Sequence, residues 1–283
     1  MRIHKFAFAF AGLMMMFSTQ AMADEVVAGA PAPAVAPAAG SNADAYIKDI
    51  NDIAGATRML EQVDKNHSPF QDQTIETNMV LNGGTHHNVT YTFTTYTKGN
   101  DKRSVRFHSP ADMRGMGVVM KGRDEVYARL PDSNKVRRVG THSKRQSFYG
   151  SDWAMDDMGM VNMAMDYDIV KIIDLKADNN THVTLELKIK PTTDLPYPKL
   201  VIKIDKKHLL MDYIEYYNES GKHLKTQYRD TLKDLGNGYE LYTHITVVDA
   251  ATKHKTENNV FSEKINQNIP DETFSKRWLV RSI

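Results

Sequence analysis

Apolar and polar side chains alternate along much of this chain, as they do in β-strands that bury one face. In residues 87–97 and 181–190, valines, leucines and aromatic residues alternate with threonine, glutamate and lysine. Residues 199–205 and 240–248 continue the pattern. We expect four alternating residues to face a common apolar interior: Tyr91, Phe93, Leu185 and Leu187.

Turn-forming sequences separate these stretches at short intervals, which predicts a meandering antiparallel sheet. Gly, Asn and Asp cluster at 82–84, 98–101, 131–134, 177–180, 219–222 and 236–238. About ten or eleven strands are expected between such turns. Because each strand pair adds twist, a sheet of this length curls, and its apolar face needs a cover. The predicted fold class is mainly β with a few helices, a large curled antiparallel sheet plugged by helices.

Two segments have the spacing expected of covering helices. Residues 43–64 carry apolar side chains three or four positions apart, from Tyr46 to Val63, with an interruption expected near Gly55. A shorter helical piece is expected within 152–166. A curled sheet plugged in this way leaves an apolar cavity between sheet and plug.

The first 42 residues differ from the rest of the chain. Two basic residues precede an apolar run, and Ala21-Met22-Ala23 fits the small-x-small cleavage pattern. We expect residues 1–23 to be a signal peptide cleaved after Ala23, which would export the protein to a bacterial periplasm. Residues 24–42 are rich in Ala, Pro and Gly, as in a flexible tether. Residues 43–283 are expected to form a single domain.

Composition narrows the chemistry. The chain has no cysteine, which excludes disulfides, thiol catalysis and thiolate metal sites. It carries 36 Lys and Arg against 35 Asp and Glu, so no nucleic-acid partner is indicated. The chain lacks a G-x-S-x-G motif. A Ser-His-Asp site around Ser151 stays an alternative, because triads assemble in space. We expect no enzymatic activity, no metal and no cofactor.

One segment, residues 149–168, combines methionines with aspartates. The methionines are Met155, Met158, Met160, Met163 and Met165. Thioethers can bind Cu(I), flexible methionines also line surfaces that accept varied apolar ligands, and they fill ordinary cores as well. All three interpretations stay open, and we expect a mobile cover over the cavity that begins at Trp153. The helix-capping role is assigned to Asp152, Asp156 and Asp157.

Four short motifs follow one another between residues 106 and 153. They are Arg106-Phe107 with Pro110-Ala111-Asp112 and Arg114-Gly115, then Leu130-Pro131, then Arg137-Arg138, and then Gly150-Ser151-Asp152-Trp153. In this order they resemble the outer-membrane lipoprotein-sorting family, the LolA/LolB-like periplasmic carriers, in the variant often found alongside large membrane exporters. Residues 216–226 and 268–279 also fit the family pattern. The chain departs from it at Met116, and at Ala128, where an aromatic residue is usual.

The resemblance implies an unclosed β-barrel with helices over its mouth that holds acyl chains. It also implies a carrier of lipid or lipoprotein cargo toward the outer membrane, with an inner-membrane exporter and an outer-membrane acceptor as partners. A lipid sensor on the same fold, a lipid esterase and a copper-binding protein are the alternatives. The basic run at 134–145 is either a solvated turn or a patch for partners or lipid head groups.

The residues expected to line the cavity are Tyr91, Phe93, Phe107, Met120, Tyr127, Trp153, Met158, Met160, Met163, Leu185 and Leu187. The family-motif residues expected to matter are Arg137, Arg138, Gly150, Ser151, Asp152 and Trp153.

Overall fold

The computed structural model describes residues 43–48, 50, 52–83, 88–130, 135–160, 162–174 and 181–281. All of them fall in one compact unit, residues 36–283. The expected signal peptide and tether lie outside the described residues, as do the expected turns at 131–134 and 177–180. No helix among the described residues combines the length and apolar character needed to cross a membrane.

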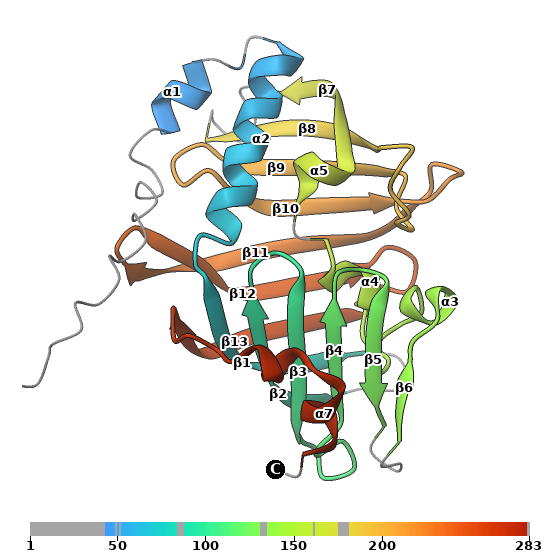
Figure 1. Ribbon diagram of the computed structural model, residues 1–283. Helices are drawn as coiled ribbons and strands as arrows, with labels where there is room; N and C mark the ends of the chain where they lie inside the picture. The colour runs from blue at the N-terminus through green and yellow to red at the C-terminus, as the bar shows by residue number, and fades with distance from the viewer. Residues whose placement is uncertain are drawn as a thin grey trace, which may run out of the picture. The chain divides into compact units, whose positions relative to one another are not determined.

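Thirteen strands of the described chain form one antiparallel sheet that is not closed (Figure 1). Their order across the sheet is β6-β5-β4-β3-β2-β1-β13-β12-β11-β10-β9-β8-β7. The strands are β1 (Asp72–Asn82), β2 (Val89–Lys98), β3 (Lys102–Ser109), β4 (Gly117–Lys121), β5 (Glu125–Arg129), β6 (Val136–Arg138), β7 (Tyr167–Asp174), β8 (His182–Ile189), β9 (Lys199–Asp205), β10 (Leu210–Tyr217), β11 (His223–Gly236), β12 (Tyr239–Asp249) and β13 (Lys255–Ile265). The helices are α1 (Ala43–Lys48), α2 (Ile53–His67), α3 (Thr141–Lys144), α4 (Met155–Met158), α5 (Met163–Asp166), the 3₁₀ helix η2 (Asp271–Phe274) and α7 (Lys276–Val280).

The predicted fold class is therefore confirmed: mainly β, antiparallel, unclosed and covered by helices. The sheet has more strands than expected, because strands such as β6 have only three residues. Alternation with a period of two cannot be recognised over so short a stretch.

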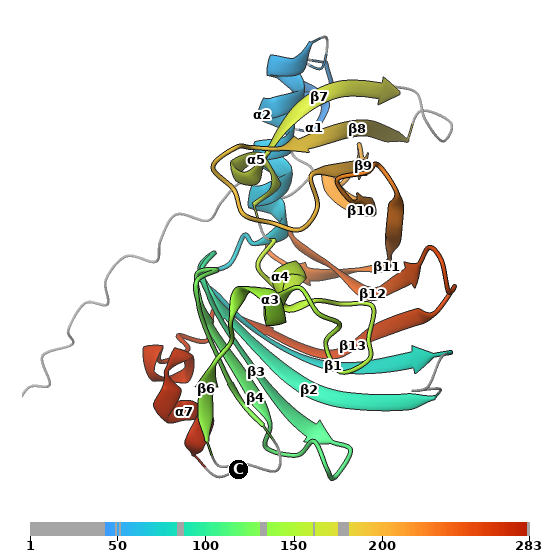
Figure 2. The ribbon, with the colours of Figure 1, turned by 90° about the vertical axis from the view of Figure 1, so that its right-hand side faces the viewer.

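The chain meanders outward from β1 and returns to it, so one long crossing joins the two halves of the sheet. From β1 the strands follow in order to β6 at one edge, and the chain then continues to β7 at the other edge. From β7 it meanders back to β13, which pairs with β1. Residues 139–166, here called the crossing segment, must therefore pass over the sheet. Figure 2 shows α3 and α4 on its concave side.

Helix α2 fills the half of the concave face formed by β7–β10. Its first turn is capped by Asp52, whose carboxylate accepts a hydrogen bond from the Gly55 N–H (2.8 Å). Side chains three and four positions apart point to the sheet and are buried: Ala56, Met59, Leu60 and Val63. They pack against fully buried strand residues that include Leu185, Leu187, Leu200 and Ile202. The helix break expected at Gly55 lies earlier, since Gly55 is inside α2 and α1 ends at Lys48.

The C-terminal segment covers the opposite, convex face of β3–β5, where Phe274 and Leu279 are fully buried (Figure 2). Arg106 of the first family-like motif holds this segment. Its guanidinium lies 4.1 Å from the centre of the Trp278 ring and donates to the Trp278 carbonyl (2.5 Å). This motif therefore ties the middle of the sheet to the end of the chain.

Tyr127, expected to line the cavity, lies on this convex face instead. Its neighbours Val126 and Ala128 are buried on the concave side, and Lys276 Nζ of α7 lies 3.9 Å from the centre of the Tyr127 ring. The alternating residues of a five-residue strand can face either side of a sheet. Here the set that contains the larger side chain, Tyr127, faces α7.

Candidate functional site

A cavity of about 290 Å³ lies where β1, β2, β3, β11, β12 and β13 meet the crossing segment. Its roof is formed by Phe148, Trp153, Asp157, Met158 and Met160. Its floor is formed by Gln73, Ile75, Thr77, Met79, Phe93, Thr95, Thr97, Arg103, Val105, Gln227, Arg229, Ile245, Asn258 and Val260. A concave, largely apolar space with a few polar groups is the usual form of a ligand site, and this one is near the lower end of the common size range of about 300–1,000 Å³.

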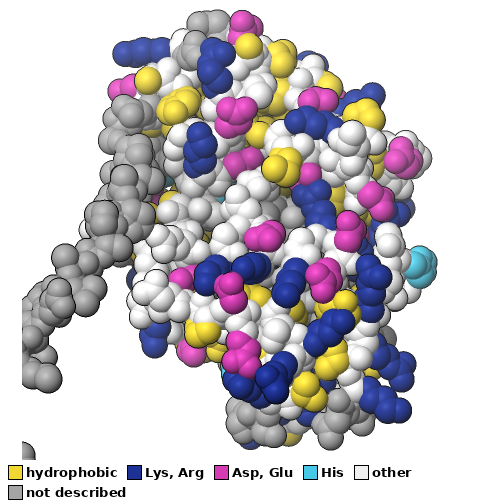
Figure 3. Space-filling model, in the orientation of Figure 1, with side chains coloured by type: hydrophobic (Ala, Val, Ile, Leu, Met, Phe, Trp, Pro, Cys, Tyr) yellow, Lys and Arg dark blue, Asp and Glu magenta, His cyan; other side chains and the backbone are white. Residues whose placement is uncertain are grey.

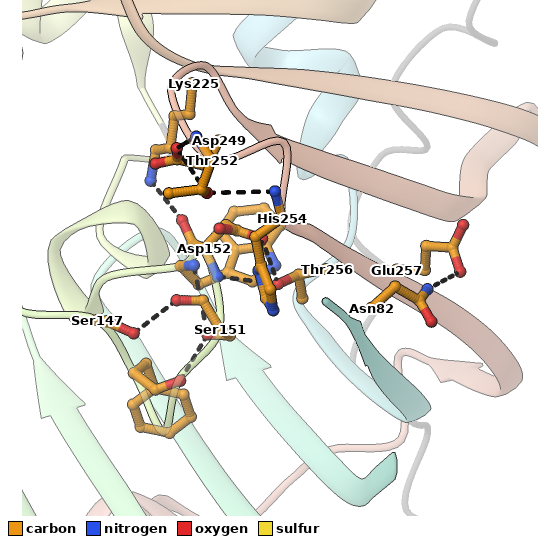
Figure 4. Close-up of polar contacts among 12 residues, drawn as sticks. Asn82, Ser147, Ser151, Asp152, Lys225, Asp249, Thr252, His254, Thr256 and Glu257 are labelled. Atoms are coloured by element: carbon orange, nitrogen blue, oxygen red, sulfur yellow. Dashed lines mark hydrogen bonds and ion pairs between the residues drawn. The ribbon is translucent and has the colours of Figure 1, made fainter. Parts of the chain in front are cut away.

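The Gly150-Ser151-Asp152-Trp153 motif anchors the roof to the sheet (Figure 4). The Asp152 N–H donates to Thr256 Oγ1 (2.8 Å), and the Asp152 carboxylate is held by Thr256 and by His254 Nδ1, each at 2.8 Å. Burial raises the pKa of Asp152, and the hydrogen bonds from Thr256 and His254 oppose that rise. The motif thus fixes the start of the roof to β13 and the turn before it.

A buried ion pair makes a second tie between roof and sheet. Lys225 Nζ of β11 lies 2.6 Å from Asp157 Oδ2, and the side chain of Asp157 is only 1% exposed. Asp157 also accepts from the Ala154 N–H (2.7 Å) and from the Tyr197 hydroxyl (2.7 Å). Asp157 therefore does cap α4 as predicted, while Asp152 bonds to β13 instead.

The far end of the crossing segment is tied to α2. The Asp64 carboxylate accepts from the backbone N–H groups of Met163 (3.0 Å) and Ala164 (2.8 Å). Burial of this carboxylate raises the pKa of Asp64 to about 6, against the opposing effect of those two bonds. The crossing segment is thus tied to the sheet at Asp152 and Asp157 and to α2 at Met163 and Ala164, and the residues that roof the cavity lie around and between these ties.

The structure separates the residues that the sequence placed in one cavity. Phe93, Trp153, Met158 and Met160 line it. Tyr91, Phe107 and Met120 pack in the apolar cluster beside it. Leu185, Leu187 and Met163 belong to the separate cluster under α2, because that helix fills the other half of the face. The four predicted interior residues therefore do not share one interior.

Arg137 and Arg138 lie exposed on the edge strand β6, and Arg138 donates to the Asp124 carbonyl (3.0 Å). These two arginines of the basic run are thus surface residues at one edge of the sheet, whereas Lys144 of the same run is buried and donates to the Arg123 carbonyl (2.8 Å).

Ester hydrolysis and copper binding would each require a specific arrangement of side chains. The Ser151 hydroxyl donates to the Phe148 carbonyl (2.5 Å), and its oxygen accepts from the Trp153 N–H (3.3 Å). His254, the histidine at this motif, bonds to Asp152. The methionines are also divided: Met163 packs under α2 and Met165 is 69% exposed. Ser151 therefore serves the turn, and the five thioethers do not converge.

Sequence reasoning missed the polar residues of the cavity floor. Arg103 and Gln73 stand in phase with the apolar residues Val105 and Ile75 on their own strands, and so face the cavity with them. The signal available in the sequence was a charged residue at the same alternating positions as the apolar residues of its strand.

Comparison with known proteins assigns the chain to a family. A family model described as "Uncharacterized protein" matches residues 99–281, and the chain belongs to that family. No curated protein sequence matches the chain.

Solved structures show the class of fold. A domain assigned to outer membrane lipoprotein sorting from Vibrio parahaemolyticus is 21% identical, with a TM-score of 0.72 over 80% of this chain and 98% of that one. A DUF1329 family protein from Desulfovibrio piger is 22% identical, with a TM-score of 0.73 over the same shares. A LolA superfamily protein from Nitrosomonas europaea is 21% identical, with a TM-score of 0.66 over 79% of this chain and 98% of that one. The protein thus has the fold of the lipoprotein-sorting and LolA superfamily proteins, which confirms the resemblance found in its motifs.

Proposed function

We propose that this protein is a periplasmic, non-enzymatic carrier that shields the acyl chain of a lipid or lipoprotein and moves it toward the outer membrane. The observation that carries the proposal is the cavity of about 290 Å³ between the unclosed sheet and the crossing segment. The fold shared with a lipoprotein-sorting domain supports the class of cargo. An inner-membrane exporter as donor and an outer-membrane acceptor complete the proposed route.

Burial in the cavity would by itself hold the acyl chain of the cargo. Each methylene shielded from water contributes about 0.8 kcal/mol, so a few methylenes under the roof give useful affinity. Release then requires the roof to move, or an acceptor that binds the cargo better. The methionines Met158 and Met160 suit a roof that repacks around chains of different length.

The test is to block the cavity. Thr95 lines it, and Thr90 on the same strand is exposed, so Thr95→Phe and Thr90→Phe form a matched pair. We expect the full chain, purified from cells that export it, to carry lipid detectable by mass spectrometry and to bind a fluorescent fatty acid. Thr95→Phe should lower probe affinity by about ten-fold or more, about 1.4 kcal/mol, and Thr90→Phe should leave it unchanged.

Transfer then separates a carrier from a sensor. A carrier moves labelled lipid from donor to acceptor vesicles at a rate that depends on its concentration. Binding without transfer would support the sensor, and release of free fatty acid from an ester would support an esterase. Equal probe binding by the two phenylalanine variants would remove the cavity from the proposal.

A further inference from the structure

Along β1, β2 and β3 the cavity floor is polar at one end and mainly apolar beyond it, while β11 and β13 add the polar side chains of Gln227, Arg229 and Asn258. Gln73, Thr97 and Arg103 are directly paired across β1, β2 and β3, and all three line the cavity. The next row toward the cavity centre contains Ile75 and Val105 on the outer two strands, with Thr95 between them. The space is therefore amphipathic along the strands, as is a molecule with a head and a tail.

The polar row holds hydrogen-bond donors that the described part of the protein leaves unused. Arg103 has no carboxylate or carbonyl partner among the described residues, and burial is what lowers its pKa, to about 10. At neutral pH it is therefore still charged. The Gln73 amide nitrogen is buried without an acceptor among the described residues, with Gln73 only 7% exposed. Gln73 is buried and Arg103 is half-buried, and donors shielded from water in this way are costly unless something bonds to them.

The charged side chains that line the cavity also favour an anion. Asp157 is the one carboxylate among the described lining residues, and Lys225 already neutralises it. A second guanidinium, that of Arg229, also lines the cavity and contacts the His67 ring (3.2 Å) and the Met211 carbonyl (3.4 Å). Burial holds the pKa of His67 well below its usual range, so this ring adds no positive charge. Neither guanidinium therefore has a carboxylate partner among the described residues that line the cavity.

This excess is local to the cavity. On the face shown in Figure 3, basic and acidic side chains are interspersed, and the whole chain has a net charge of +1. A second hollow of about 430 Å³ shares Arg103 and Met158 with the cavity, so Arg103 stands where the two spaces adjoin. A headgroup there would have room beside the tail site.

We propose that the cargo is an anionic single-chain amphiphile whose carboxylate or phosphate binds the Arg103 guanidinium, with Thr97 and Gln73 completing the contact and the tail lying along Ile75 and Val105. A guanidinium matches either anion with two parallel hydrogen bonds. The size of the cavity favours one chain over several. This inference rests on the proposed carrier function and specifies its cargo.

The experiment compares probes of one chain length that differ only at the head. The full chain is titrated with a fatty acid, the corresponding alkyl phosphate and the corresponding alcohol. We expect both anions to bind about 10- to 100-fold more tightly than the alcohol. The stronger of the two anions identifies the headgroup source. Arg103→Gln should remove this preference and leave alcohol binding unchanged.

Arg277→Gln is the matched control, because Arg277 is exposed in helix α7 on the convex face. It should keep the full preference for anions. A second measurement covers folding: without ligand, Arg103→Gln should melt at the same or a higher temperature, since it removes a half-buried charge that has no partner among the described residues.

The outcomes separate the two proposals. If no probe binds, the carrier function itself fails. If anions and alcohol bind wild type equally well, the carrier function stands and the headgroup site is overturned. If Arg103→Gln weakens all three probes alike, Arg103 has only a structural role and the inference is wrong.

Discussion

The two halves of the concave face are built from the same kind of strand but are filled differently. Under α2, strands β7–β10 meet a 15-residue amphipathic helix, and the apolar side chains between them are fully buried. Over β1–β3 and β11–β13 the cover is the crossing segment, whose helices α3 and α4 have four residues each. Helical turns that short cannot present a continuous apolar stripe, so a cavity remains beneath them.

The difference shows which part of the fold carries stability and which part is available for ligand. The half under α2 is a packed core, where removing side-chain volume lowers stability. The other half is held by a few polar ties from the crossing segment, among them Lys225–Asp157 and the two bonds to Asp64. Such ties can fix the cover while leaving the space below it open.

The largest effect is expected from breaking the buried ion pair. Lys225→Met leaves Asp157 buried without its counter-ion, and such a loss typically costs about 3–5 kcal/mol. Lys233→Met on the same strand removes a pair in which the lysine is 53% exposed, and it should cost at most about 1 kcal/mol. Urea unfolding measures both. Similar losses in the two variants would show that the roof tie is no stronger than a surface pair.

A matched isoleucine pair compares the two halves directly. Ile202 is fully buried in the cluster under α2, and Ile75 lines the cavity. Ile202→Ala should lower the free energy of unfolding by about 2–5 kcal/mol, and Ile75→Ala by clearly less, because its side chain already borders open space. Chemical denaturation tests this. A larger loss at Ile75 would contradict the division into a filled and an open half.

The pH dependence of stability should report on Asp64. Its pKa is raised to about 6 in the folded protein, above the ordinary value of 3.8. The folded state therefore binds more protons between pH 4 and 6, so this group makes the protein less stable as pH rises through that window. At about 1.4 kcal/mol per pKa unit, the loss is up to about 3 kcal/mol.

Unfolding curves at pH 4 to 8 for wild type and Asp64→Asn isolate this contribution. Asparagine cannot ionise, and its side-chain oxygen can still accept from the Met163 or Ala164 N–H. The difference in free energy of unfolding between the two proteins should change from pH 4 through about 6 and level off about one pH unit above the folded-state pKa. A difference that is constant throughout would show that Asp64 titrates normally.

The smallest effects should divide the methionines. Met158 and Met160 line the cavity; Met160 also packs in the cluster under α2, and Met163 packs in that cluster without lining the cavity. Met158→Ser and Met160→Ser should each weaken binding of a fatty-acid probe by roughly ten-fold, from about 1.5 kcal/mol of lost apolar contact. Met163→Ser should mainly lower stability. Tight Cu(I) binding by wild type, lost in the first two variants while lipid binding is kept, would favour the copper interpretation.

Some features of this protein follow from its sequence alone, because they depend on neighbours along the chain. Alternation of apolar and polar residues predicted the strands, turn residues predicted the antiparallel meander, and the apolar spacing before Val63 predicted the helix that became α2. Motifs such as Gly150-Ser151-Asp152-Trp153 were enough to indicate the family fold.

Tertiary structure decided everything that depends on which strands lie opposite one another. A period of two shows that Tyr127 and Ala128 face opposite sides, but not which side is covered by α7. Nor can it show that α2 lies over Leu185 rather than Phe93, or that Gln73 and Arg103, 30 positions apart, share one row of the sheet. Local periodicity determines which residues of a strand share a face. Only pairing with distant segments fixes its neighbours, and in this protein those neighbours determine which half of the face is core and which half is cavity.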